Sequence, residues 1–133
     1  MRIPAVYAMP SLDMQVNNMI EKQQSPIFSK TSNLLLWLLQ HTEKYPKCER
    51  FRLAKRIEDT AFNFYEYLIE AVKSDQKMAF LSSADLELDK LRLYLRLAHN
   101  RKLADHGQYL FAAENLTEIG RLLGGWIKTP NQT

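Results

Sequence analysis

Residues 34–39 read Leu-Leu-Leu-Trp-Leu-Leu, and this stretch decides the fold. Six consecutive apolar residues cover every side of an α-helix, so a helix that contains them is expected to be buried all round. Upstream, Ser25-Pro26 is typical of an N-cap followed by proline at the first helical position, and Pro46 downstream ends the element. The sequence therefore predicts a first helix from Ser25 to about Tyr45.

The second predicted helix spans about residues 48–74 and carries two apolar stripes. One stripe keeps the three- and four-residue steps of a single helix face. It consists of Ala54, Ile57, Ala61, Phe64, Leu68 and Val72. The other stripe lies beside it and consists of Phe51, Phe62, Tyr65 and Ile69. Two stripes on one helix indicate burial on two sides.

Two further helices follow. Ser82 and Ser83 are candidate N-caps for the third helix, which ends at the basic pair Arg101-Lys102. Its apolar seam is Leu88, Leu91, Leu95 and Ala98. Asp105-x-x-Gln108 resembles a capping box that begins the fourth helix. The seam of that helix is Tyr109, Ala112, Leu116, Ile119, Leu123 and Trp126.

The connections between these helices are short, and short loops make consecutive helices antiparallel neighbours. The predicted fold class is therefore all-α, an up-down-up-down four-helix bundle over residues 25–133, with residues 1–24 as a flexible N-terminal arm. The first two helices carry more apolar surface than one bundle can hide, so we expect a homo-oligomer. The expected interface residues are Leu35, Trp37, Leu38, Phe62 and Tyr65.

Length and composition narrow the class of protein. A chain of 133 residues is long enough for one domain with a real core. Its single cysteine, Cys48, excludes an internal disulfide and fits a reducing compartment. The longest apolar run is far shorter than the about 20 residues that span a bilayer, and no signal-peptide pattern follows Arg2. We expect a cytoplasmic protein without a membrane partner.

Positive charge is concentrated in two basic windows. The first, residues 47–56, holds five Lys and Arg against one acid, and the second, residues 90–102, holds five against none. An antiparallel turn between the second and third helices would place both windows at one end of the bundle, which points to a polyanionic partner such as RNA or DNA. The expected contacts are Arg52, Lys55, Arg56, Arg92, Arg96, Arg101 and Lys102. The alternative is a solvated face whose cations pair with acids such as Glu58 or Asp59.

An enzymatic alternative rests on Arg92 and His99. Their spacing places both side chains on one helix face and is close to the Arg-x4–6-His motif of HEPN-type ribonucleases, although Leu93 stands where a polar residue often follows the arginine. A histidine at an interface or on the surface is the competing interpretation. No zinc-ligand spacing, phosphate-binding loop or dinucleotide fingerprint occurs. We therefore expect no catalytic residue, no metal and no cofactor.

Three blocks of sequence resemble the accessory variability determinant (Avd) proteins of diversity-generating retroelements. They are FRLAKRIED at residues 51–59, LRLYLRLAH at 91–99 and EIGRLLGGWI at 118–127, in the expected order and spacing. The resemblance covers about residues 26–128. It implies a four-helix protomer in a homopentameric barrel with a basic surface and no catalytic activity of its own.

The same resemblance implies the partners. Such proteins bind the retroelement's reverse transcriptase and its template-repeat RNA, and the complex makes error-prone cDNA that is mutagenised at adenines. The implied basic contacts are Arg52, Lys55 and Arg56 in the first block and Arg92 and Arg96 in the second. The family is similar in fold to four-helix proteins encoded in intervening sequences of ribosomal RNA genes. A structural oligomer of that kind, without nucleic-acid affinity at moderate salt, is the alternative function.

Overall fold

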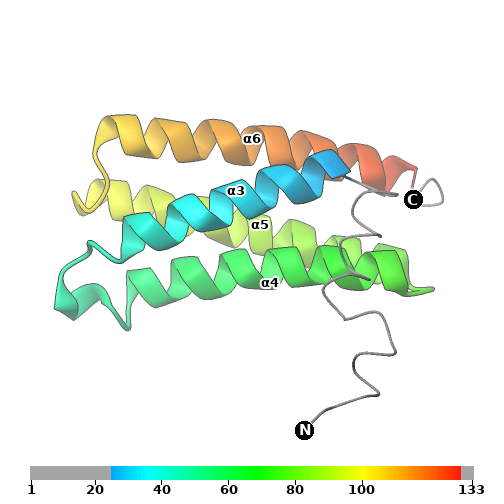
Figure 1. The fold of residues 1–133 in the computed structure, drawn as a ribbon, viewed down its shortest axis with the longest axis horizontal. Coiled ribbons are helices and arrows are strands. Elements are labelled where there is room, and N and C mark those ends of the chain that lie inside the picture. The colour runs from blue at the N-terminus through cyan, green and yellow to red at the C-terminus, as the bar shows by residue number, and fades with distance from the viewer. Residues whose placement is uncertain (1–24, 130–133) are drawn as a thin grey trace, which may run out of the picture.

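Four antiparallel α-helices make up the part of the chain that the computed structural model describes, residues 25–129 (Figure 1). They are α3 (Ser25–Thr42), α4 (Leu53–Lys73), α5 (Lys77–Asn100) and α6 (His106–Lys128), with a 3-10 turn, η1 (Lys47–Glu49), before α4. No strand occurs within residues 25–129, which confirms the predicted all-α four-helix fold. The predicted arm, residues 1–24, lies outside the described residues.

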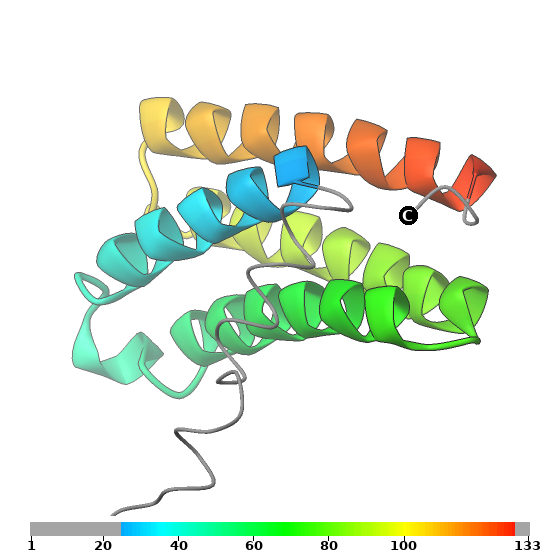
Figure 2. The same cartoon turned by 45° about the vertical axis from the view of Figure 1, so that its right-hand side comes forward.

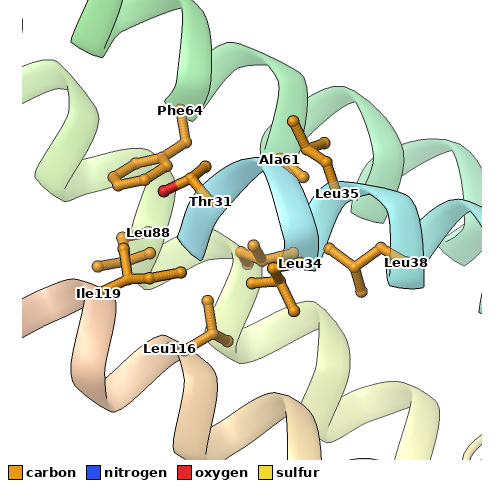
Figure 3. Close-up of a pocket in the computed structure, with 10 residues that line it drawn as sticks. Thr31, Leu34, Leu35, Leu38, Ala61, Phe64, Leu88, Leu116 and Ile119 are labelled. Atoms are coloured by element: carbon orange, nitrogen blue, oxygen red, sulfur yellow. The ribbon is translucent and has the colours of Figure 1, made fainter. Parts of the chain in front are cut away.

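The hydrophobic core runs between the four helices. The seams predicted on α5 and α6 are confirmed, except that Tyr109 is only half-buried, and on α4 the buried position near the C-terminus is Ala71 instead of Val72. Around Thr31 and Leu34 the core leaves a cavity of about 10 Å³ between side chains of all four helices (Figure 3). A volume of this size holds about one water molecule, so this cavity offers no room for a small-molecule ligand.

The apolar run on α3 is buried on one side only. Leu35 and Leu38 pack into the protomer's own core, whereas Leu36 is 59% exposed and Trp37 is half-buried. This corrects the expectation that Leu35 and Leu38 lie at an oligomer interface, because their surface is already covered within one chain. Successive side chains of a helix point about 100° apart, so neighbouring residues of the run face different sides and only some of them face the core.

Helix α4 begins later than predicted, at Leu53 instead of near Cys48. Pro46 leads into η1, and the chain then turns at Arg50 and Arg52 before the helix starts; Arg52 has φ −116° and ψ −104°, outside the helical region. Phe51 therefore does not belong to the apolar stripe predicted for this helix and is 80% exposed.

Helix α5 begins earlier than predicted, at Lys77, so Ser82 and Ser83 lie inside the helix and cap nothing. The turn from α4 is correspondingly short. The Lys77 ammonium donates hydrogen bonds to the carbonyl oxygens of Ala71 (3.1 Å) and Val72 (3.2 Å). These carbonyls lie in the last turn of α4, where a helix provides no backbone N–H partner for them. This contact joins the two helices in the region that the sequence analysis leaves between residue 74 and the candidate caps Ser82 and Ser83.

Candidate nucleic-acid interface

The two basic windows meet at one end of the bundle, as predicted. The connection from α3 to α4 and the turn from α5 to α6 lie at the same end, opposite the α4–α5 turn (Figures 1 and 2). An ion pair joins them: Arg101 donates from Nε (3.1 Å) and Nη2 (2.5 Å) to Oε2 of Glu49. Glu49 is only 1% exposed, so its carboxylate is buried where it binds the half-exposed Arg101.

In the first window, most cations point to solvent without an acidic partner. Lys55 pairs with Asp59 at 2.8 Å, one helical turn ahead, and Arg52 lies 3.8 Å from the buried Glu49. Lys47, Arg50 and Arg56 are exposed and form no ion pair within residues 25–129. Arg52 precedes α4, although the helix predicted over residues 48–74 would include it.

In the alternative interpretation, the cations of the first window pair with acids such as Glu58 or Asp59. Glu58 is engaged elsewhere, because its Oε2 accepts a hydrogen bond from the Thr42 hydroxyl at 2.5 Å. That bond ties the end of α3 to the first turns of α4, and Glu58 forms no ion pair with the cations of the first window within residues 25–129.

In the second window, acids from outside the window engage three of the five cations. Lys90 lies 3.1 Å from Glu87, and Arg92 lies 2.8 Å from Asp89, each one turn upstream, while Arg101 holds Glu49. The hydrogen bond from Lys90 to Glu87 raises the pKa of the lysine and keeps it charged. The remaining two, Arg96 and Lys102, are exposed and unpaired in the described part of the chain.

Arg92 lies across α6 because a glycine makes room for it. A Cβ atom at Gly120 would stand 2.5 Å from Nη2 of Arg92, and that same nitrogen donates weakly to the Leu116 carbonyl oxygen at 3.4 Å. Arg92 and Arg96 then line a groove of about 190 Å³ between α5 and α6, together with Tyr109. Both guanidinium groups come from α5, and guanidinium groups are suited to bind carboxylates and phosphates.

Lys102 is held outward by the way α5 ends. Its φ of 66° is the one positive value at a non-glycine residue among residues 25–129. The Leu103 N–H donates to the Ala98 carbonyl (2.8 Å) and the Lys102 N–H to the His99 carbonyl (3.0 Å), which is a Schellman motif with lysine at the position that glycine usually occupies.

Just after this motif, the predicted capping box of α6 is confirmed. The Gln108 N–H donates to Asp105 Oδ1 at 2.8 Å, and the Asp105 N–H donates to Gln108 Oε1 at 2.9 Å. The turn that carries Arg101 and Lys102 is therefore fixed on both sides by local hydrogen bonds.

Arg92 and His99 do not form a joint site. His99 stacks on Tyr109 with ring centroids 4.7 Å apart, and its Nδ1 lies 3.1 Å from the Ala104 carbonyl oxygen, so the ring is part of the α5–α6 packing. Arg92 starts about 10 Å away along the helix and is engaged with Asp89 and α6. The geometry favours the interpretation of His99 as an interhelical packing residue.

Trp37 and His41 belong to an aromatic cluster on the α3–α6 side. The two rings stack at 4.9 Å, Trp37 contacts Phe111 at 5.0 Å, and the Tyr45 hydroxyl lies 2.7 Å from His41 Nε2. Burial lowers the pKa of His41 and raises the pKa of Tyr45, so both stay uncharged at neutral pH. Trp37, predicted at an oligomer interface, thus has packing partners within its own chain.

Of the other predicted interface residues, Phe62 remains exposed and Tyr65 is half-buried, with its ring edge-on to Phe28 at 5.6 Å. Sequence reasoning missed a stripe of exposed leucines on α5: Leu86, Leu93 and Leu97. Steps of seven and four residues place all three on one helix face. This spacing can be seen in the sequence, but the buried leucines of the same helix form a second, longer apolar row that draws the prediction to the core face.

No group of three or more His, Cys, Asp or Glu side chains within residues 25–129 is placed to hold a metal ion. None of the described helices is long and apolar enough to cross a membrane.

Comparisons with known proteins place the chain by family. No curated protein matches it, and no solved structure matches it. The model of one family, described as bAvd-like, matches residues 25–130, which includes every helix described above and all three sequence blocks that resemble Avd proteins. The chain therefore belongs to the bAvd-like family.

Proposed function

We propose that this protein is a non-catalytic, cytoplasmic accessory protein of a diversity-generating retroelement, which binds the reverse transcriptase and its template-repeat RNA or cDNA. The observation that carries the proposal is a group of exposed cations at one end of the bundle that form no ion pair with an acid in the described residues. They are Lys47, Arg50, Arg56, Arg96 and Lys102. Membership in the bAvd-like family supplies the biological context.

The basic end binds phosphates, and phosphate binding has a measurable signature. Each neutralised phosphate releases counterions, so affinity falls steeply with salt. Arg56 lies in the first turn of α4 and Arg96 in the last turns of α5, and the antiparallel packing brings both toward the same end. Arg92, Lys55 and Arg52 add charge, although each lies near an acid.

The test combines co-purification with a salt titration. The full chain is purified with the reverse transcriptase and repeat RNA of its own locus, and the Arg56→Gln/Arg96→Gln double variant is compared with Lys73→Gln/Lys128→Gln, which removes two charges at the opposite end. We expect the first double variant to lose RNA affinity and to flatten the salt dependence by about 0.7 per lost contact to single-stranded RNA. Equal binding by both double variants would contradict the placement of the interface.

We further propose that the protein works as a homo-oligomer, a pentamer as Avd proteins imply, and that the leucine stripe of α5 contributes to the contact between subunits. Exposed Leu86, Leu93 and Leu97 form a row that an adjoining subunit would bury. Light scattering on the wild type and on Leu93→Lys tests this: the variant should fall to a smaller species with unchanged helicity. A monomeric wild type would refute the oligomer.

The second candidate function is a structural oligomer like the proteins of ribosomal intervening sequences. It is favoured by the ion pairs that already engage Lys90, Arg92 and Arg101. This candidate predicts no RNA binding at moderate salt and no complex with a reverse transcriptase, so the experiment above separates the two. RNA cleavage lost in His99→Ala would instead revive the ribonuclease alternative.

A further inference from the structure

Phe51 is the most exposed of the large apolar side chains in the described part of the chain, at 80%. A single exposed apolar residue is common on protein surfaces and by itself needs no explanation. This one stands between Arg50 and Arg52, both exposed, in the short segment that joins η1 to α4. The one acid in the first basic window, Glu49, is buried and paired with Arg101, so the exposed residues on either side of Phe51 in the sequence are both cations.

The segment that presents Phe51 is firmly built. The Arg50 N–H donates to the Lys47 carbonyl and the Arg52 N–H to the Glu49 carbonyl, both at 3.1 Å. Glu49 is fixed in turn by Arg101, and Leu53, directly after the turn, is buried in the core. Since both sides of the segment are anchored, the outward position of the phenyl ring follows from the fold.

An aromatic ring flanked by arginines matches one kind of ligand well. Proteins that bind single-stranded nucleic acid combine cations that follow the phosphates with aromatic rings on which unpaired bases stack. A duplex offers phosphates but keeps the faces of its bases covered. A protein partner could also use an exposed phenylalanine, but the arginine on each side favours a polyanion with flat, apolar faces.

We propose that Phe51 is a stacking platform for an unpaired base of single-stranded RNA or cDNA, with Arg50 and Arg52 contacting the adjoining phosphates. The proposal rests on the nucleic-acid binding proposed above and deepens it: the basic end then distinguishes single strands from duplexes, with Phe51 providing the distinction.

The test measures binding of the full-length protein to an unstructured CA-repeat oligoribonucleotide and to an RNA duplex of the same length. Phe51→Ala should weaken single-strand binding at least about fivefold, because base–aromatic stacking contributes this much or more per base. The slope of affinity against salt should stay unchanged, since no charge is lost, and duplex binding should be unaffected. Phe51→Trp should retain single-strand affinity. The matched control is Met78→Ala, which removes an exposed apolar side chain at the opposite end of the bundle.

Each other outcome overturns the proposal in a recognisable way. If the wild type binds the single strand and Phe51→Ala binds it equally well, stacking is wrong while nucleic-acid binding stands. If Phe51→Ala keeps RNA affinity but loses the reverse transcriptase, Phe51 is an anchor for a protein. If the wild type binds neither RNA even at low salt, the proposed function fails together with this inference.

Discussion

The two basic windows hold the same number of cations but differ in how those cations are used. In residues 47–56, Lys55 pairs with the exposed Asp59 and Arg52 lies 3.8 Å from Glu49, while the other three cations form no ion pair within residues 25–129. In residues 90–102, which contain no acid, Lys90, Arg92 and Arg101 are all engaged by acids that lie upstream or on another element. The window without an acid in its own sequence therefore has more of its cations paired. The reason is that ion pairs form between residues one helical turn apart or on neighbouring elements, and not only between residues of the same window.

The largest expected effect in this comparison comes from Arg101→Ala. The substitution leaves the buried Glu49 carboxylate without its donor, and we expect the free energy of unfolding to fall by about 3 kcal/mol. Glu49→Gln should cost less, about 1 kcal/mol, because the half-exposed Arg101 can then be hydrated. Urea denaturation of both variants measures the difference, and equal losses would show that the pair does not depend on which partner is buried.

A second substitution tests the other unusual residue of the same window. Lys102→Gly should raise the free energy of unfolding by about 1 kcal/mol, because a left-handed backbone strains any residue with a Cβ atom. Thermal unfolding should show this as an increase in Tm of about 4 °C. Lys102→Ala is the control: it removes the same charge but keeps the strained backbone, so its Tm should not rise.

The smallest expected effect on stability belongs to Arg96, one of the two cations of the second window that form no ion pair within the described residues. Arg96→Gln should change the free energy of unfolding by less than about 0.5 kcal/mol, yet lower the affinity for single-stranded RNA. Lys90→Gln removes a cation already paired with Glu87 and should lower that affinity less. RNA titrations at two salt concentrations compare the variants. An equal loss of affinity would mean that pairing does not decide which cations are available.

Much of the fold follows from local chemistry that a sequence displays. The capping box of α6 at Asp105 is set by neighbouring residues, and the sequence predicts it at the right place. The start of α5 was missed because Ser82 and Ser83 are typical caps, while what extends the helix back to Lys77 is a contact across the turn to α4. Such contacts exist only in the folded chain.

The candidate site was predictable in its location and less so in its members. The antiparallel order of the helices was enough to bring both windows to one end. The residues that remain free could not be foreseen, since Glu49 reaches Arg101 across 52 positions of sequence. Phe51 was assigned to a buried stripe because the helix was extended through it, and only the turn at Arg52 turns that ring to solvent.

The ion pair between Glu49 and Arg101 also bears on the rates of folding and unfolding. Its members come from two turns that are distant in sequence, so the contact can form only when the ends of α4 and α5 have already come together. A contact that is absent from the folding transition state leaves the folding rate unchanged and slows unfolding. The buried carboxylate would then lower the unfolding rate of the folded bundle and have little effect on its folding rate. It would therefore determine the lifetime of the basic end.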